Sequence, residues 1–92
     1  MTWIVVYSRK AAKLREKLPE RAKAVLDALI IDIRATGPMR GDWPHYSKLS
    51  DGSHHCHLKK GQPTYVAVWR VQDNEILIVE FTYVGTHEKA PY

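Results

Sequence analysis

The chain has 92 residues, of which 45% are hydrophobic and 26% charged, and its formal net charge is +4. This length fits one domain with one hydrophobic core, and the composition excludes a disordered chain. A single cysteine, Cys56, excludes an internal disulfide and fits a reducing compartment. No signal-peptide pattern is present, and no apolar run approaches the about 20 residues of a membrane span. We therefore expect a cytoplasmic protein that does not enter a membrane.

The N-terminal half predicts one strand followed by two helices. Residues 2–7 are β-branched and aromatic, which favours a strand. Ser8 suits the N-cap of a first helix, and Pro19 suits the first turn of a second. Apolar residues then recur at spacings of three and four until Gly37-Pro38 ends the pattern. The expected result is an antiparallel pair of helices joined by a short turn.

The C-terminal half predicts strands. Residues 38–53 are rich in turn formers and have room for one short strand around residues 46–49. Three strand candidates follow at 53–59, 64–71 and 75–84, separated by plausible hairpin turns. The predicted fold is a single α+β domain over residues 1–92. Two N-terminal helices pack on a mostly antiparallel four-stranded sheet, in the order strand–helix–helix–strand–strand–strand.

Positive charge is concentrated in residues 8–23, where seven basic and two acidic residues give a local net charge of +5. A segment of this kind favours a polyanionic partner, either a nucleic acid or an acidic protein. A solvated helix face is an equally compatible interpretation.

Four of the five histidines lie in residues 53–60 and 85–92, which suggests proton transfer or metal binding because imidazole titrates near neutral pH. Period-two alternation divides the strand at 53–59 between two faces, with Cys56 and Leu58 on the core side. The open face then carries a cationic, titratable row formed by His55, His57 and Lys59.

A metal site is one interpretation of this row. His55 and His57 can share an ion, and His87, Asp51 or Cys56 can complete the shell. Tetrahedral zinc sites more often use closely paired cysteine ligands, and Cys56 is expected to face away from the two histidines. We therefore predict neither a metal site nor a cofactor.

Metal-independent cleavage of RNA is a second interpretation. This chemistry needs a base for the ribose 2′-hydroxyl proton, cations for the phosphate and an acid for the leaving 5′-oxygen. His57 and His87 can serve as acid and base. The groups available to bind phosphate are His55, Lys59, Lys60 and Arg70. The rings available to stack on an unpaired base are Tyr65, Trp69 and Tyr92. A histidine cluster without chemistry, on a sheet face used only for docking, is the third interpretation.

The segment Cys56-His57-Leu58, the apolar strand at 65–71, and Gly85-Thr86-His87 followed by a terminal aromatic, Tyr92, form an ordered pattern. In this pattern the chain resembles the RelE/ParE toxin superfamily, and most closely the YafQ branch. The resemblance spans nearly the whole chain. It implies a toxin of a type II toxin–antitoxin system that cuts mRNA in the ribosomal A site and is bound by a cognate antitoxin.

The resemblance also implies roles for individual residues. His57 and His87 match the family's strand histidine and the histidine after Gly-Thr, Tyr92 matches the C-terminal aromatic, and His45 falls near a further family histidine. All four are candidate catalytic residues. The candidates for contact with ribosomal RNA phosphates are Arg9, Lys10, Lys13, Arg15 and Lys17.

Three departures accompany this resemblance. Tyr83 stands two residues before Gly85, where the YafQ branch has an arginine. Val66 follows Tyr65, where RelE-type strands often have arginine, and the turn at 59–64 is longer than in the family. A non-enzymatic member of the same fold is the alternative function, either a ParE-type gyrase-binding toxin or an inactive relative.

Overall fold

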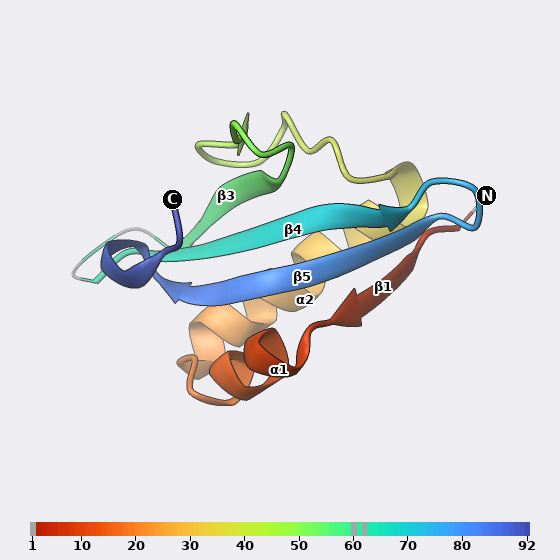
Figure 1. Ribbon diagram of the computed structural model, residues 1–92. Coiled ribbons are helices and arrows are strands. Elements are labelled where there is room, and N and C mark those ends of the chain that lie inside the picture. Colours follow the sequence, from red (N-terminus) through yellow and green to blue (C-terminus); the bar gives the residue numbers. More distant parts are fainter. Residues whose placement is uncertain (1, 60, 62) are drawn as a thin grey trace.

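The computed structural model describes residues 2–59, 61 and 63–92 and places two helices against one face of a single sheet (Figure 1). The elements in chain order are β1 (Ile4–Tyr7), α1 (Arg9–Glu16), α2 (Glu20–Thr36), β2 (Ser47–Lys48), β3 (His54–Lys59), β4 (Tyr65–Asp73), β5 (Ile78–Thr86) and a 3-10 turn, η1 (His87–Lys89). Among the described helices, none is long and apolar enough to cross a bilayer.

The sheet has the strand order β1-β5-β4-β3-β2. β1 runs parallel to β5, and the other neighbours are antiparallel. The predicted α+β class and element order are confirmed. The predicted number of four strands is corrected to five, because the short strand expected in the 38–53 segment forms at Ser47–Lys48 and pairs with β3.

The helix boundaries follow from their capping residues. The Ser8 hydroxyl accepts a hydrogen bond from the Ala11 amide at 3.0 Å and caps α1. Pro19 is the N-cap of α2 and not, as predicted, a residue of its first turn. Gly37 ends α2 with φ +99°, and its amide donates to the Ile33 carbonyl at 2.8 Å.

The main core lies between the helices and the sheet. α2 buries an apolar stripe that includes Leu26 and Leu29, and β4 and β5 present Trp69 and Phe81 to it. A smaller cluster on the opposite, open face consists of Val66, Val68 and Tyr83. We call these two sides of the sheet the helix face and the open face. The helix face supplies most of the hydrophobic stabilisation, so the open face can carry polar groups.

The predicted alternation along β3 is confirmed over most of its length. Cys56 packs in the helix-face core, whereas His57 pairs in register with Val66 of the open-face cluster. A register shift between His57 and Lys59 then pairs Lys59 with Tyr65, whose ring packs against the helix-face core. The predicted row of His55, His57 and Lys59 is therefore wrong at Lys59, because this bulge removes it from the row.

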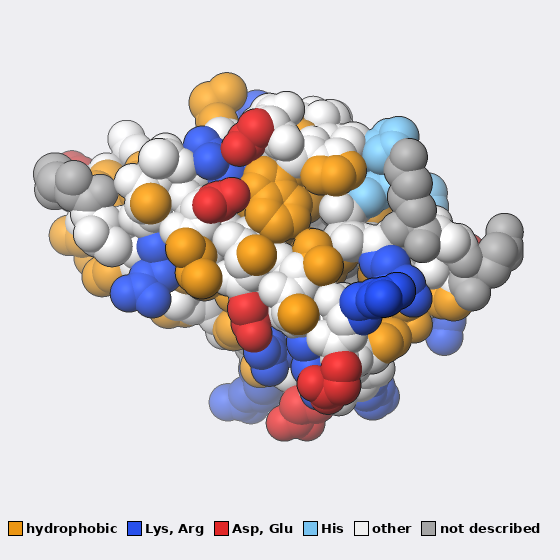
Figure 2. All heavy atoms as spheres, turned by 180° about the vertical axis from the view of Figure 1, so that it is seen from behind, with side chains coloured by type: hydrophobic (Ala, Val, Ile, Leu, Met, Phe, Trp, Pro, Cys, Tyr) orange, Lys and Arg blue, Asp and Glu red, His pale blue; other side chains and the backbone are white. Residues whose placement is uncertain are grey.

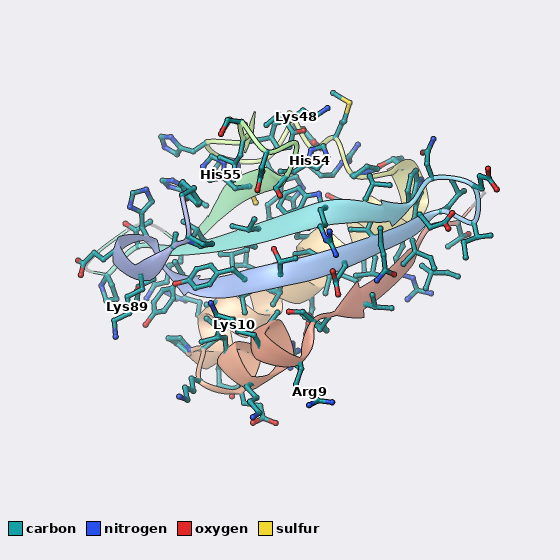
Figure 3. The ribbon with its side chains drawn as sticks, in the orientation of Figure 1. Arg9, Lys10, Lys48, His54, His55 and Lys89 are labelled. Carbon is teal, nitrogen blue, oxygen red and sulfur yellow. The ribbon has the colours of Figure 1, made fainter. Side chains whose placement is uncertain are left out.

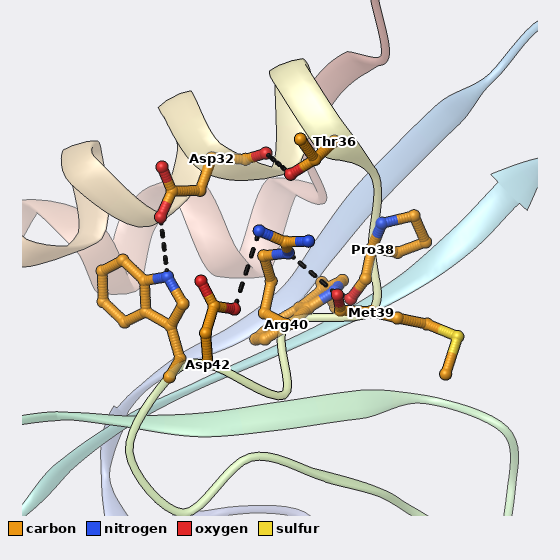
Figure 4. A network of polar contacts seen from close by, with 8 residues as sticks. Asp32, Thr36, Pro38, Met39, Arg40 and Asp42 are labelled. Atoms are coloured by element: carbon orange, nitrogen blue, oxygen red, sulfur yellow. Dashed lines mark hydrogen bonds and ion pairs between the residues drawn. The ribbon is translucent and has the colours of Figure 1, made fainter.

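The 38–53 segment is held against the helices and the sheet by two indole N–H groups. Trp43 Nε1 donates to the Asp32 carboxylate of α2 at 2.8 Å, within the polar network of Figure 4. Trp69 Nε1 donates to the Pro38 carbonyl at 2.9 Å. A segment that has only one two-residue strand is thus attached to α2 at one point and to β4 at another.

His54 extends this attachment. Its Nδ1 lies 2.6 Å from the Tyr46 hydroxyl, and its ring stacks on Trp69 with centroids 5.8 Å apart. Only 3% of the residue is exposed. Burial lowers the pKa of His54, and the charge of Lys48 lowers it further. The neutral His54 ring therefore has a structural role. The candidates for chemistry on β3 are the histidines of the open face, His55 and His57.

We predict a pH-dependent stability from this stack. The folded pKa of His54 lies below its ordinary value of 6.5, so the stability contributed by the neutral ring is complete above pH 6.5 and is lost as the pH falls towards the folded pKa. Urea denaturation between about pH 7.5 and about pH 5 should show a falling free energy of unfolding. His54→Gln should reduce this slope without abolishing it, because the pKa of His55 is also lowered. An unchanged slope in the variant would contradict the assignment.

Candidate active site

His57 and His87 meet on the open face although 30 positions of sequence separate them. Their ring centroids lie 5.6 Å apart in an edge-to-face arrangement. Both line a hollow of about 280 Å³ beside the turn between β3 and β4. The His87 amide donates to the Thr64 carbonyl at 2.8 Å, which attaches the start of η1 to this turn. The sheet register and this hydrogen bond together bring the two imidazoles to one site.

His45 joins this pair from the 38–53 segment. Its ring stacks on His57 with centroids 4.3 Å apart. The His57 amide donates to the Pro44 carbonyl at 2.9 Å, and Tyr46 bonds His54, so the residues on both sides of His45 are anchored to β3. His45 has φ +53°, an uncommon conformation for a residue with a side chain, which these anchors maintain.

The C-terminal Tyr92 completes the cluster. Its ring centroid lies 4.7 Å from that of His55 and 6.0 Å from that of His87, and the residue is 48% exposed. Figure 2, which views the molecule from behind, shows histidine side chains emerging together at one end. The four residues predicted to be catalytic, His45, His57, His87 and Tyr92, thus lie in continuous ring contact, while their roles remain predictions.

His55 belongs to the open face but is only 8% exposed. Its Nδ1 lies 2.9 Å from the Ser47 hydroxyl of β2, and Tyr92 covers its ring. Burial lowers the pKa of His55, and the charges of His87 and His45 lower it further. A buried imidazole that favours its neutral form supports the Tyr92 ring, so the predicted phosphate contact by His55 is not favoured by this environment.

Two predicted base-stacking residues lie elsewhere. Trp69 is completely buried on the helix face, so its prediction as a stacking platform is wrong. Tyr65 packs against the helix-face core, and together with Tyr83 it lines a different hollow from the one lined by His57 and His87. The apolar pattern of the strand at 65–71 did not reveal which of its two faces would be covered by the helices.

The predicted phosphate-binding cations are also displaced from the site. Arg70 forms an ion pair with Glu80, with Nη2 3.0 Å from Oε1. It lies four residues along β4 from Val66, the register partner of His57, or about 13 Å at the usual rise per residue. The predicted contact at Lys60 falls outside the described residues. Neither Arg70 nor the displaced Lys59 is therefore part of the histidine cluster.

Tyr83, which stands where the YafQ branch has an arginine, braces the segment that presents His87. Its hydroxyl donates to the Thr86 carbonyl at 2.7 Å. It also lies over Gly85, where a Cβ atom would come within 2.7 Å of the hydroxyl oxygen. A side chain at position 85 would therefore have to displace the Tyr83 ring.

The basic residues of α1 divide into two groups. Arg15 pairs with Asp27 of α2, with Nη2 2.9 Å from Oδ1, so this predicted RNA contact is engaged within the protein. The remaining predicted contacts line a second hollow, of about 530 Å³, together with Leu14: Arg9, Lys10, Lys13 and Lys17. Figure 3 shows Arg9 and Lys10 on the α1 side of the molecule.

Cys56 and Asp51, the two further residues discussed as metal ligands, are both engaged elsewhere. Cys56 is buried on the helix face, and burial raises the pKa of its thiol to about 12. Asp51 accepts a hydrogen bond from the Ser53 amide at 2.9 Å within its own turn. Within residues 2–59, 61 and 63–92, no three His, Cys, Asp or Glu side chains are grouped to hold an ion.

Comparisons with known proteins define the class of fold. No protein-family model matches the sequence, and no curated protein matches it significantly. A mutant of the Escherichia coli toxin RelE in the free state is 17% identical, with a TM-score of 0.72 over 98% of this chain and 88% of that chain. The RelBE2 toxin–antitoxin complex of Mycobacterium tuberculosis gives 22% identity and a TM-score of 0.69 over 95% of this chain and 100% of that chain.

An archaeal RelE–RelB complex from Pyrococcus horikoshii gives 12% identity and a TM-score of 0.68, over 98% of this chain and 100% of that chain. The chain therefore has the fold of the RelE toxins, as its sequence resemblance implied. At these identities the comparison establishes the fold alone, and assignment to the YafQ branch stays a prediction.

We predict that Gly85→Ala displaces the Tyr83 hydroxyl and destabilises the protein. The added methyl group would meet the hydroxyl oxygen at 2.7 Å, and such overpacking costs about 1–3 kcal/mol. Thermal unfolding should show this loss, and adding Tyr83→Phe should recover part of it because the closest atom is removed. Strictly additive effects of the two substitutions would contradict this contact.

Proposed function

We propose that the chain is the toxin of a type II toxin–antitoxin module and cleaves mRNA in the ribosomal A site. The observation that carries this proposal is the ring contact of His45, His57, His87 and Tyr92 beside one surface hollow. Two titratable rings and an exposed aromatic ring are the groups that cleavage through the ribose 2′-hydroxyl needs.

The reaction requires only proton transfers and charge stabilisation. One imidazole, either His57 or His87, takes the proton of the ribose 2′-hydroxyl while that oxygen forms a bond to phosphorus. The other donates a proton to the 5′-oxygen as the phosphorus–oxygen bond to it breaks. The products are a 2′,3′-cyclic phosphate and a 5′-hydroxyl. Rings 5.6 Å apart can both reach one phosphodiester in the hollow.

The neighbouring rings would set the geometry of this step. His45 stacks on His57 and limits its rotation, and Tyr92 offers an exposed ring on which the nucleobase next to the cleaved bond can stack. Because His55 supports Tyr92 from below, the platform is held against the sheet. The catalytic proton donors and the base-stacking ring thus belong to one packed assembly.

The partners of this proposed toxin are a cognate antitoxin, mRNA and ribosomal RNA in the cytoplasm. Several of the structural neighbours are toxin–antitoxin complexes, which supports a protein inhibitor for this chain as well. The exposed cations of α1, Arg9 and Lys13 among them, provide the positive surface for ribosomal RNA. Binding of this kind weakens steeply with salt because counterions are released from the phosphates.

The decisive test compares wild type with His57→Ala and His87→Ala. We expect each substitution to reduce cleavage of a translated mRNA by about 10²–10⁴-fold, the usual contribution of general acid–base catalysis. Primer extension on mRNA bound to purified ribosomes, and growth arrest on controlled expression, measure this loss.

Arg34→Gln is the control, because Arg34 is an exposed residue of α2 that lies beside Trp3 and not beside the histidines. It should retain cleavage at a temperature where the variant is folded. Equal toxicity of wild type and both active-site variants would overturn the nuclease proposal. Toxicity with DNA damage signalling and intact translation would instead support gyrase binding.

We further predict that Tyr92 acts through its ring. Tyr92→Phe should retain most cleavage. Tyr92→Ala should lose about 1–3 kcal/mol of stacking, which is roughly 5- to 150-fold in cleavage at subsaturating mRNA. Cleavage assays at several mRNA concentrations separate binding from rate. Equal losses in both variants would assign the effect to the hydroxyl.

A further inference from the structure

The proposed cleavage also needs a cation for the phosphate backbone near the histidines, and among residues 2–59, 61 and 63–92 the cations predicted for this role lie elsewhere. Arg70 is paired with Glu80, and Lys59 lies beside Tyr65 on the helix face. The family arginine is replaced by Tyr83, a buried residue whose hydroxyl is bonded to the Thr86 carbonyl. A substitute charge near Tyr83 therefore has to come from other segments of the chain.

Lysines approach Tyr83 from α1. Among the residues that the structure describes, β1 pairs with β5 only from Ile78 to Phe81, and no strand pairs with the remainder of β5 on that side. α1 follows β1 directly, and its Leu14 packs against the open-face cluster that contains Tyr83. The Lys10 ammonium lies 5.9 Å from the centroid of the Tyr83 ring. A cation on the first turns of α1 thus reaches the position where the family has arginine.

Two further lysines line a hollow of about 270 Å³ against the same tyrosine. These lysines are Lys17, which is the C-cap of α1, and Lys89, which is the last residue of η1. The rings of Tyr65 and Tyr83 line this hollow together with them. Lys89 lies two residues after His87 and was not singled out from the sequence. Three lysines from two distant segments are therefore gathered around Tyr83.

These three charges are available to a ligand. Within the part of the chain that the structure describes, Lys10, Lys17 and Lys89 form no ion pair. Arg15 and Arg70, in contrast, are each bound to a carboxylate. All three lysines are exposed, so an anion can approach without displacing an internal partner.

The lysine cluster lies close to the proposed cleavage site. His55 pairs with Val68, and Val68 pairs with Tyr83, so a distance of two strand spacings, about 10 Å, separates His55 from Tyr83 along one row of the open face. η1 connects the two places directly, since it carries His87 at one end and Lys89 at the other. An RNA strand cut at the histidines would carry its neighbouring phosphates past this row.

We propose that Lys10, Lys17 and Lys89 form a subsite for a backbone phosphate of the mRNA that neighbours the cleaved bond. The subsite rests on the proposed nuclease function and supplies the charge that the missing arginine would have supplied. Tyr83 is its positioning residue, because its ring carries Lys10 on one side and lines the hollow with Lys17 and Lys89. The ligand is the RNA substrate itself and not ribosomal RNA.

The test combines lysine replacement with neutral phosphates. Single-turnover cleavage is measured on saturating ribosome complexes, with mRNA carrying one methylphosphonate at successive positions beside the cleaved bond. For wild type, neutralising the contacted phosphate should slow cleavage about tenfold, since hydrogen bonds to charged groups contribute this much. The variant Lys10→Gln, Lys17→Gln, Lys89→Gln should be slowed about tenfold on natural mRNA and no further by the methylphosphonate.

A second variant serves as the control and removes three positive charges from positions outside the proposed subsite. Arg21→Gln, Arg34→Gln, Lys48→Gln changes exposed cations of α2 and β2. It should keep the full wild-type penalty for the methylphosphonate, and circular dichroism should show both variants folded. If the lysine variant keeps the penalty too, or loses only ribosome affinity, the lysines bind ribosomal RNA and the subsite is refuted. If wild type cleaves no better than His87→Ala, the nuclease proposal fails first and separately.

Discussion

The two faces of the central strands are the constraint on which the rest of this molecule depends. β3 and β4 bury Cys56 and Trp69 against the helices, and this packing commits the alternate positions to the open face. His57 reaches the surface because its neighbours are core residues. A shift of one residue in register would place His57 in the core and Cys56 at the surface. The stability of the helix face and the chemistry of the open face are therefore consequences of one register.

The 38–53 segment shows how an irregular stretch can place a side chain with accuracy. Two indole N–H groups attach this segment to the rest of the protein. Its Trp43 donates to Asp32 of α2, and Trp69 of β4 donates to the Pro38 carbonyl of the segment. The contacts of Pro44 and Tyr46 with β3 then enclose His45, whose backbone has a positive φ. These side-chain and backbone hydrogen bonds thus fix the conformation of a segment that has little regular secondary structure. Because one of these groups is the neutral His54, acidification weakens the same assembly that presents the stacked histidines.

Ion pairing distinguishes the cations that hold the structure from those that face solvent. Arg15 and Arg70 have carboxylate partners, whereas lysines from α1 and η1 surround Tyr83. Although no arginine stands two residues before Gly85, positive charge is present around that position in the folded protein. Tyr83 occupies that position in the sequence, braces Gly85 and Thr86, and leaves the charge to neighbouring segments.

The sequence by itself determined the α+β class, the element order and the face of each residue along β3 up to His57, because periodicity and capping are local properties. It also singled out His57, His87 and Tyr92, because the short motifs that contain or precede them can be read without knowledge of the fold. Only the tertiary structure decided that Trp69 is buried and Lys59 displaced, since an apolar strand does not reveal which face the helices cover and a bulge has no clear sequence signal. The convergence of histidines from β3, η1 and the 38–53 segment likewise depends on long-range register and hydrogen bonds, which no local pattern encodes.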